Sequence, residues 1–382
     1  MSRSWPLVPL REAASPVERP EVPLPGTVYR QVGVRLWGEG AYEREPMDGS
    51  QTKYATLSRV EGGDIVVNKI WARNGSVAVV PDALGGAYVS GEFPTFVPAR
   101  QKLDPRWFHW FTKTPNCWDQ CDEKSRGTSG KNRIRPEQFL EITIPLPSLG
   151  DQRRIVARIE VLAAKIEEAR ALRGHASQGA DQFIPSLHLS LSGARSLRLD
   201  QFLQLYEDQE PVQAGRSYPQ IGIKGFGQGL FARAPVEGSQ TTYAAFNRLY
   251  DGAVVLSQVK GWEGAIAVCP SAFSGAYVSP EYRTFRCIPS QAIPEYLEGL
   301  FPTPWFWNKL SDLTRGVGAR RERVRPELFL NMEIPMPPVN DQRRAVPTFE
   351  RVRVLRRLQA ETGAELDALL PSILDRAFKG EL

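Results

Sequence analysis

The sequence predicts an α+β protein in which two homologous mixed α/β domains are joined by two long antiparallel coiled-coil helices. Three observations lead to this fold class: the chain is written twice, short apolar runs alternate with glycine-rich turns in each copy, and each copy ends in a helical pattern. Similar domains joined by helices of matched register imply an internal pseudo-two-fold. We expect a first domain at residues 1–147, a central helical spacer at 148–195, a second domain at 196–337 and a C-terminal helical spacer at 338–382.

The internal repeat is long and free of gaps over its central part. Tyr29–Phe96 aligns with Tyr218–Phe285, and roughly 40% of the positions are identical. The string GSQTKYA at Gly49–Ala55 returns as GSQTTYA at Gly238–Ala244. Solenoid repeats are short units that need several neighbours, so two long copies instead predict two modules, each with its own core.

Each copy begins with strands and continues with short helices. The apolar runs GDIVVNKI and SVAVVP in the first copy, and AVVLSQV and AIAVCP in the second, are bounded by glycine-rich turns, which is typical of β-strands. Leu103–Trp118 and Ile293–Leu310 are aromatic-rich stretches that predict short helices. Each copy is therefore expected to fold as a mixed α/β domain.

A helical pattern follows the proline-bounded strands ITIPLP and MEIPMP, and Ser148 and Asn340 stand where an N-cap is expected. In the first copy, apolar residues at alternating spacings of four and three are typical of a coiled-coil seam: Ile155, Ile159, Leu162, Ile166 and Ala169. In the second copy Pro347 replaces Ala157, so that helix is either kinked or begins later than the cap suggests. The alternative is a pair of amphipathic helices that pack only on their own domains.

The composition is that of an ordinary globular protein, with 42% hydrophobic and 24% charged residues. The sequence has no apolar run long enough for a membrane helix and its first residues lack the apolar core of a signal peptide, so we expect a cytoplasmic protein. Four cysteines are too few for a disulfide framework in a chain of this length and are expected to be reduced. A net charge of +5 permits a nucleic-acid partner without requiring one.

The motifs of several enzyme classes are missing. A DNA methyltransferase that flips its target base holds the base with an amide or carboxylate followed by two prolines and an aromatic residue, and no such string occurs. The glycine-rich GFGQG at Gly225–Gly229 does not open a helix, which favours a turn over a cofactor loop. His109 aligns with Glu298, and the spacing of His109, Cys117 and Cys121 fits no common zinc module. We therefore expect no catalytic residues, no metal and no cofactor.

The layout of domain, proline-bounded strand and DQRR-type helix, followed by the same again, closely resembles the specificity subunits of type I restriction-modification systems. The resemblance is carried by IPLPSLGDQRRIVARIEVLAAKI at Ile144–Ile166, by IPMPPVNDQRR at Ile334–Arg344 and by ALLPSILDRAFKGEL at Ala368–Leu382, and it covers nearly the entire chain. One departure is that the two domains are unusually alike, which a recent duplication would explain.

This resemblance implies two target-recognition domains, each of which reads one half of a bipartite double-stranded DNA sequence. It also implies that DNA methyltransferase subunits dock along the helices and that a restriction or translocase subunit joins them. In this interpretation the chain is a non-catalytic scaffold and sequence reader, and its partners supply the catalysis. The alternatives are a self-contained DNA nuclease or modification enzyme, and a structural or RNA-binding adaptor.

Candidate DNA-binding residues come from three loops in each copy. The NKIWARNG and SQVKGWEG turns offer cations and planar rings, the basic stretches RGTSGKNRIRP and RGVGARRERVRP offer several guanidinium groups, and GSQTxYA offers amides and hydroxyls suited to base edges. The alternatives are an exposed hairpin for the first pair, a domain-bracing role for Arg135 and Arg325, and a structural turn for the last. The candidates are Ser50, Gln51, Tyr54, Lys69, Trp71, Arg73, Arg126, Lys131, Asn132, Arg133 and Arg135 in the first copy, and Ser239, Gln240, Tyr243, Lys260, Trp262, Arg315, Arg320, Arg321, Arg323 and Arg325 in the second.

Overall fold

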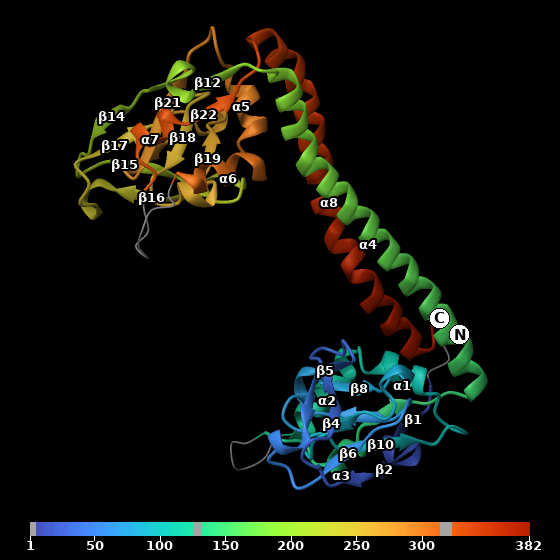
Figure 1. Cartoon of the computed structure of the whole chain (residues 1–382). Helices are drawn as coiled ribbons and strands as arrows, with labels where there is room; N and C mark the ends of the chain where they lie inside the picture. The colour runs from blue at the N-terminus through green and yellow to red at the C-terminus, as the bar shows by residue number, and fades with distance from the viewer. Residues whose placement is uncertain (1–4, 126–131, 314–322) are drawn as a thin grey trace. The chain divides into compact units, whose positions relative to one another are not determined.

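The structure, a computed structural model, describes residues 5–125, 132–313 and 323–382 (Figure 1). The chain divides into two compact units: Met1–Arg170 with Gly363–Leu382 make up unit 1, and Ala171–Thr362 make up unit 2. Both units contain helices and sheets, so the predicted mixed α+β character is confirmed. Within the described ranges, none of the helices has the length and apolarity needed to cross a membrane.

Unit 1 contains three sheets. The five-stranded sheet has the order β3 (Pro20–Glu21), β6 (Leu57–Arg59), β9 (Tyr88–Val89), β4 (Val28–Val34) and β5 (Ala41–Asp48). The four-stranded sheet has the order β2 (Ala14–Val17), β10 (Thr95–Pro98), β7 (Ile65–Val67) and β8 (Val77–Val79), and β1 (Leu7–Pro9) pairs with β11 (Thr143–Pro145). The short helices are α1 (Pro105–Phe111), α2 (Pro115–Ser125) and α3 (Pro136–Phe139).

Burial follows the place of each element in unit 1. All three residues of β7 are buried because this strand lies inside its sheet, whereas most side chains of β5 are exposed because β5 is an edge strand. Trp107 and Phe108 of α1 share one core with Phe96 of β10 and Phe139 of α3. The indole Nε1 of Trp107 donates to the carbonyl of Pro145 at 2.8 Å, which satisfies its only polar group inside the core.

Unit 2 repeats this arrangement strand for strand. Its five-stranded sheet has the order β14 (Asp208–Pro211), β17 (Ala245–Arg248), β20 (Tyr277–Val278), β15 (Ser217–Lys224) and β16 (Gly229–Glu237). Its four-stranded sheet has the order β13 (Leu203–Leu205), β21 (Tyr282–Cys287), β18 (Val254–Ser257) and β19 (Ile266–Val268), and β12 (Ser196–Arg198) pairs with β22 (Glu333–Pro335). The short helices are α5 (Pro294–Leu300), α6 (Pro304–Asp312) and α7 (Pro326–Asn331).

Two long helices, α4 (Leu149–Ser192) and α8 (Val339–Lys379), each contribute to both units. Ser148 lies directly before α4, and its Oγ accepts from the amide of Asp151 at 3.2 Å, as an N-cap does. The expectation that Asn340 caps α8 is wrong, because the helix already begins at Val339. The helix also continues through Pro347, so it does not begin later than the cap suggested.

The two helices pack against each other and against the domains. In unit 1, Ile155 and Ile159 are buried in the same cluster as Trp107 of the domain and Leu374 from the end of α8. The start of α4 therefore packs both on its domain and on the other helix, and the alternative that the helices pack only on their own domains is wrong there.

In unit 2 the helices run antiparallel. A guanidinium N–H of Arg173 donates to Thr362 Oγ1 at 2.7 Å, while Arg356 lies 2.6 Å from the carboxylate of Asp181, so the partner on α8 moves backward as α4 advances.

Candidate nucleic-acid interface

The GSQT loops form short 3-10 turns, η2 (Gly49–Gln51) and η6 (Gly238–Gln240), directly after the edge strands. In unit 1 the amide of Ser50 donates to Asp48 Oδ1 at 2.8 Å, and Gln51 Oε1 accepts from the Asp48 amide at 3.1 Å. These contacts are the structural-turn role foreseen for the loop, since the side chains of Asp48 and Gln51 each accept a hydrogen bond from a backbone amide of the turn. In unit 2 Glu237 replaces Asp48 and makes no cap hydrogen bond to η6.

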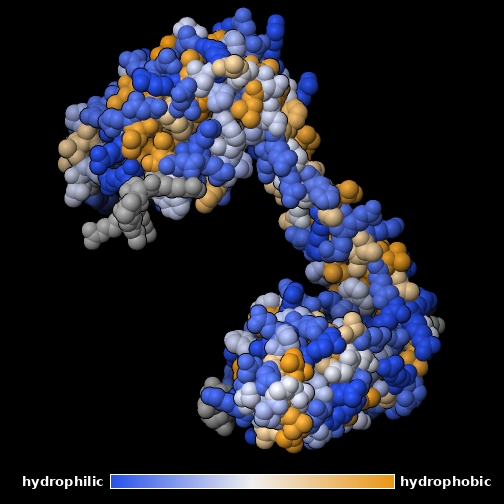
Figure 2. Space-filling view, viewed as in Figure 1, coloured by the Kyte–Doolittle hydropathy of each residue, from blue (hydrophilic) through white to orange (hydrophobic). Residues whose placement is uncertain are grey.

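The aromatic residues of the GSQT loops face solvent. The exposed fraction of Tyr54 is 46% and that of Tyr243 is 41%. On the face drawn in Figure 2, small hydrophobic spots lie among mostly hydrophilic residues in both units. Exposed tyrosines combine a flat apolar ring with a hydroxyl, so they can contact both a sugar or base face and a base edge.

The NKIWARNG and SQVKGWEG turns lead into η3 (Ala72–Asn74) and η7 (Gly261–Glu263). Trp71 and Trp262 are exposed, Arg73 is half-buried, and Lys69 Nζ donates to the carbonyl of Gly91 at 2.7 Å. The repeat alignment does not match tryptophan with tryptophan: Trp71 corresponds to Lys260, and Arg73 corresponds to Trp262. The two units therefore present similar kinds of side chain in a different order.

A hollow of about 540 Å³ in unit 1 brings three predicted residues together, namely Gln51, Tyr54 and Trp71. Arg44 of β5 and Lys53 also line it, and the sequence analysis missed both. The missed signal for Arg44 was its identical counterpart Arg233 in the second copy, on the matching exposed edge strand. The hollow combines amide, phenol, indole and cationic groups, which is the chemistry that contacts bases and phosphates.

Part of the basic stretches lies outside the described residues, including Arg126, Lys131, Arg315, Arg320 and Arg321. The described remainder shows one ion pair in both units: Arg133 lies 3.2 Å from Glu92, and Arg323 lies 3.1 Å from Glu281. Each arginine side chain remains about half exposed, at 49% and 58%, so each glutamate orients a cation that still faces solvent. A third group of candidates lies beside these pairs: Asn132 is half-buried, and Arg135 and Arg325 are exposed directly before α3 and α7.

The DQRR motif fixes the start of each long helix on its domain. Gln152 is fully buried: its Oε1 accepts from the amide of Asp104 at 2.9 Å, and its Nε2 donates to the carbonyls of Lys102 and Pro147, both at 2.8 Å. Gln342 is also fully buried and binds the matching backbone groups of its own unit, accepting from one amide at 3.1 Å and donating to two carbonyls at 2.7 and 2.8 Å. In the sequence the motif is one of the strings that carry the family resemblance, and its spacing gives no sign of this anchoring role.

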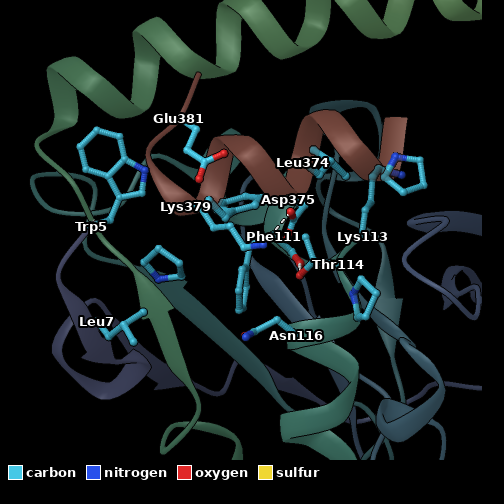
Figure 3. A pocket seen from close by; sticks show the side chains of 14 residues that line it. Trp5, Leu7, Phe111, Lys113, Thr114, Asn116, Leu374, Asp375, Lys379 and Glu381 are labelled. Atoms are coloured by element: carbon cyan, nitrogen blue, oxygen red, sulfur yellow. Dashed lines mark hydrogen bonds and ion pairs between the residues drawn. The ribbon is translucent and has the colours of Figure 1, made fainter. Parts of the chain in front are cut away.

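A second hollow of about 540 Å³ lies in unit 1 between the domain and the end of α8, and none of the predicted DNA-binding residues lines it (Figure 3). Asn116 and Leu374 line it, whereas their counterparts in unit 2, Trp305 and His188, pack ring against ring at 4.9 Å. His188 Nδ1 also lies 2.7 Å from Tyr296 Oη, and burial lowers the pKa of His188 to about 4. The imidazole is therefore neutral at neutral pH and acts as a core group.

All four cysteines are buried free thiols, and a hydrogen bond with Cys121, together with burial, raises the pKa of Cys117 well above its usual value. Burial lowers the pKa of His109 to about 4. Across the part of the chain that the structure describes, no three His, Cys, Asp or Glu side chains gather in a way that could hold a metal ion.

Comparison with known proteins links this architecture to one family. Residues 42–172 match the type I restriction modification DNA specificity domain. The chain is 22% identical over 303 residues to the EcoKI specificity subunit of Escherichia coli K12, and this match spans 71% of the chain but only 64% of that subunit, which is less than two thirds of its length.

Solved structures share the fold over nearly the whole chain. The HsdS subunit from Thermoanaerobacter tengcongensis has a TM-score of 0.62 at 24% identity, and the match covers 99% of this chain and 97% of that one. A chain from a study of complex assembly and conformational transition of the type I R-M system has a TM-score of 0.67 at 22% identity, with coverage of 99% and 98%. The recognition made from the sequence, a resemblance to type I restriction-modification specificity subunits, is confirmed: residues 42–172 match the DNA specificity domain of that family, and the strand order of the first copy is repeated in the second.

Proposed function

We propose that this chain binds double-stranded DNA sequence-specifically, reads a bipartite target with one domain per half-site, and carries DNA methyltransferase subunits on its helices. The observation that carries the proposal is the repeated set of exposed aromatic, amide and basic side chains on the same loops of both units. The target-recognition domains are residues 1–147 and 196–337, and the helical spacers are 148–195 and 338–382. Such a role places the chain in the cytoplasm, with access to DNA.

Each domain has groups suited to two kinds of DNA contact. Gln51 and Gln240 can pair with the edge of an adenine, and Arg44 and Arg233 can pair with guanine or phosphate. Lys53 adds a cation in unit 1 where the repeat places Thr242 in unit 2. Because aligned positions on these loops differ in chemistry, the two half-sites are expected to differ in sequence.

The basic stretches add a second contact region. The guanidinium groups of Arg133 and Arg323 are held by glutamates at the same place in both units, which reduces the entropy lost when an arginine binds a base or phosphate. Their described neighbours Asn132, Arg135 and Arg325 belong to the same proposed surface.

The long helices offer the surface for the methyltransferase subunits. Five large apolar side chains on α4 and α8 have exposed fractions between 46% and 62%: Val161, Leu172, Leu355, Leu358 and Leu369. These side chains are the apolar contacts that the helices can offer to a bound protein. Catalysis is then supplied by the bound subunits, with a restriction or translocase subunit as a further partner.

A binding assay tests the nucleic-acid part of the proposal. The full chain is titrated with duplex DNA and with RNA of the same length at two salt concentrations, with Mg²⁺ present to reveal any cleavage. We expect binding to DNA that weakens steeply with salt, since phosphate contacts release counterions, and we expect no cleavage. Preference for RNA would support the adaptor alternative, and cleaved DNA would support the nuclease alternative.

Capture of a methyltransferase subunit tests the scaffold part. Arg154→Glu and Arg344→Glu reverse exposed charges next to the buried glutamines of the DQRR motif, with side-chain exposures of 56% and 82%. We expect less captured subunit with little change in melting temperature. Unchanged capture would remove this end of each helix from the docking surface.

A further inference from the structure

Trp37 and Phe226 are the non-glycine residues with positive φ in the described part of the chain, at 55° and 54°. They occupy the same position of the repeat, in the turns LWGEG (residues 36–40) and GFGQG (residues 225–229) that connect β4 to β5 and β15 to β16. We call these two segments the strained turns. The left-handed conformation is unfavourable for a residue with a Cβ, and more so for a bulky one, so each turn stores strain that glycine would avoid.

The two rings project into solvent in spite of being large and apolar. The exposed fraction is 52% for Trp37 and 59% for Phe226. Each ring rests by one edge on a tryptophan from the matching helix: Trp37 on Trp118 of α2 at 5.4 Å, and Phe226 on Trp307 of α6 at 5.9 Å. The copies have diverged at more than half of their positions, yet both keep an exposed aromatic side chain in this strained conformation.

The strained turns are held rigidly against the loops already proposed to bind DNA. The amide of Trp37 donates to the carbonyl of Asn74 in η3 at 2.7 Å, and the amide of Phe226 donates to the carbonyl of Glu263 in η7 at 2.6 Å. In unit 1, Lys113 Nζ also donates to the carbonyl of Gly38 at 2.8 Å. The backbone of each exposed aromatic residue is therefore hydrogen-bonded directly to η3 or η7, next to the side chains already proposed to bind DNA.

A cation precedes each strained turn by the same spacing, because Arg35 stands two positions before Trp37 and Lys224 two positions before Phe226. Arg35 lies over the ring of Tyr42 at 5.2 Å, and at the matching positions Lys224 lies over Phe231 at 5.4 Å. These rings lie across glycines of the preceding strands, where a Cβ would come within 2.6 Å of the ring. A positive charge next to a rigid exposed aromatic ring complements a polyanion whose bases have flat apolar faces.

We propose that Trp37 and Phe226 are wedge residues that insert at a base step of the DNA half-site bound by their own unit. This inference rests on the proposed function. It adds an event that the reading of base edges in the grooves does not require, namely the unstacking of one base step, which bends or kinks the duplex. Preorganisation is the reason for the strain. A ring fixed in advance loses no conformational freedom when it enters the stack.

The test uses the full chain and a duplex that the wild-type chain has enriched from a randomised DNA pool. Dissociation constants are compared for wild type, Trp37→Ala, Phe226→Ala and Val28→Ala, the last being a control because Val28 is a 67% exposed side chain on β4. Unstacking is read at each step by substituting the fluorescent base 2-aminopurine. We expect each aromatic variant to weaken binding by roughly 5- to 100-fold and to abolish the unstacking signal in one half-site only, a different one for each variant.

Trp37→Gly separates a wedge from a structural role. It removes the ring and also the strain, so it should melt at a higher temperature than Trp37→Ala while binding DNA equally weakly. If the ring only supports the fold, DNA affinity should instead recover along with the melting temperature, and the proposal fails. Wild-type affinity and an unchanged unstacking signal in the folded variants would also overturn it. Failure of the wild-type chain to enrich any duplex would overturn the proposed function together with this inference.

Discussion

Gln152→Leu is the substitution that tests most sharply how each long helix is attached to its domain. Leucine has a similar volume and remains buried, but it removes one acceptor and two donors from a fully buried site. The amide of Asp104 and the carbonyls of Lys102 and Pro147 then lose their partners. Because the two side chains have similar volumes, the packing around the site need not change. The loss of stability therefore reports on the three hydrogen bonds.

The magnitude follows from the three backbone groups left behind. A buried donor or acceptor without a partner costs about 1 to 3 kcal/mol, so three of them give a loss of roughly 3 to 9 kcal/mol, less whatever the extra apolar burial returns. The free energy of unfolding of a domain is typically about 5 to 15 kcal/mol, so the substitution should remove a large part of the stability of unit 1. Arg154→Ala, two residues further along the helix and on its exposed side, should cost under about 0.5 kcal/mol.

Urea unfolding with hydrogen exchange measured peptide by peptide provides the assay. Gln152→Leu should lower the midpoint and accelerate exchange in peptides of unit 1, and Gln342→Leu should do so in peptides of unit 2. The reasoning is refuted if Gln152→Leu unfolds at the same urea concentration as Arg154→Ala, or if exchange increases equally in both units.

Three further predictions address the DNA surface, the core and the helices. Arg133→Ala and Arg323→Ala should each weaken binding to one half-site by about 1 to 3 kcal/mol per base contact, as measured by titration of labelled duplexes, and unchanged binding would limit these arginines to their glutamates. Burial lowers the pKa of His188 from 6.5 to about 4, so on acidification the unfolded state binds the proton before the folded state does, and the stability of unit 2 should fall as the pH drops from about 6.5 to 4. His188→Leu should flatten this part of the stability-versus-pH curve, as measured by urea unfolding. An equal slope in both proteins would assign the pH dependence to other groups. Four residues inserted after Ala169 add about 6 Å of helix and should lengthen the preferred DNA spacer by about one to two base pairs, as measured by site selection. Two inserted residues should instead rotate the apolar seam away from its partner and damage folding. An unchanged spacer in a DNA-binding variant with four inserted residues would mean that the distance is set elsewhere.

The repeat made much of the fold predictable from the sequence. Apolar runs such as SVAVVP and AIAVCP lie in β8 and β19, and the aromatic stretches form α1, α2, α5 and α6. The strand order was not predictable, because β9 and β20 have only two residues each and are held by non-local partners, including a parallel pairing of Gln31 with Tyr88. Strands this short have no periodicity of their own to read.

The site was only partly predictable for a related reason. GSQT was interpreted as either a DNA contact or a turn, and the capping contacts to Asp48 confirm the turn in unit 1 while Tyr54 remains exposed. GFGQG was correctly interpreted as a turn, but the positive φ of Phe226 runs against residue preference and could only come from the structure. The anchoring role of Gln152 was equally hidden, because two of its three partners, Asp104 and Lys102, are backbone groups far away in the sequence.

Selection of sites from a randomised duplex pool by the full chain, followed by sequencing, tests the central claim most directly. The account predicts one enriched pattern with two short specified segments separated by an unspecified spacer of constant length. Exchange of the loop residues Trp71 and Arg73 for their counterparts Lys260 and Trp262 should then alter one segment and leave the other unchanged. Enrichment of a single continuous site, or of no DNA sequence at all, would contradict the account.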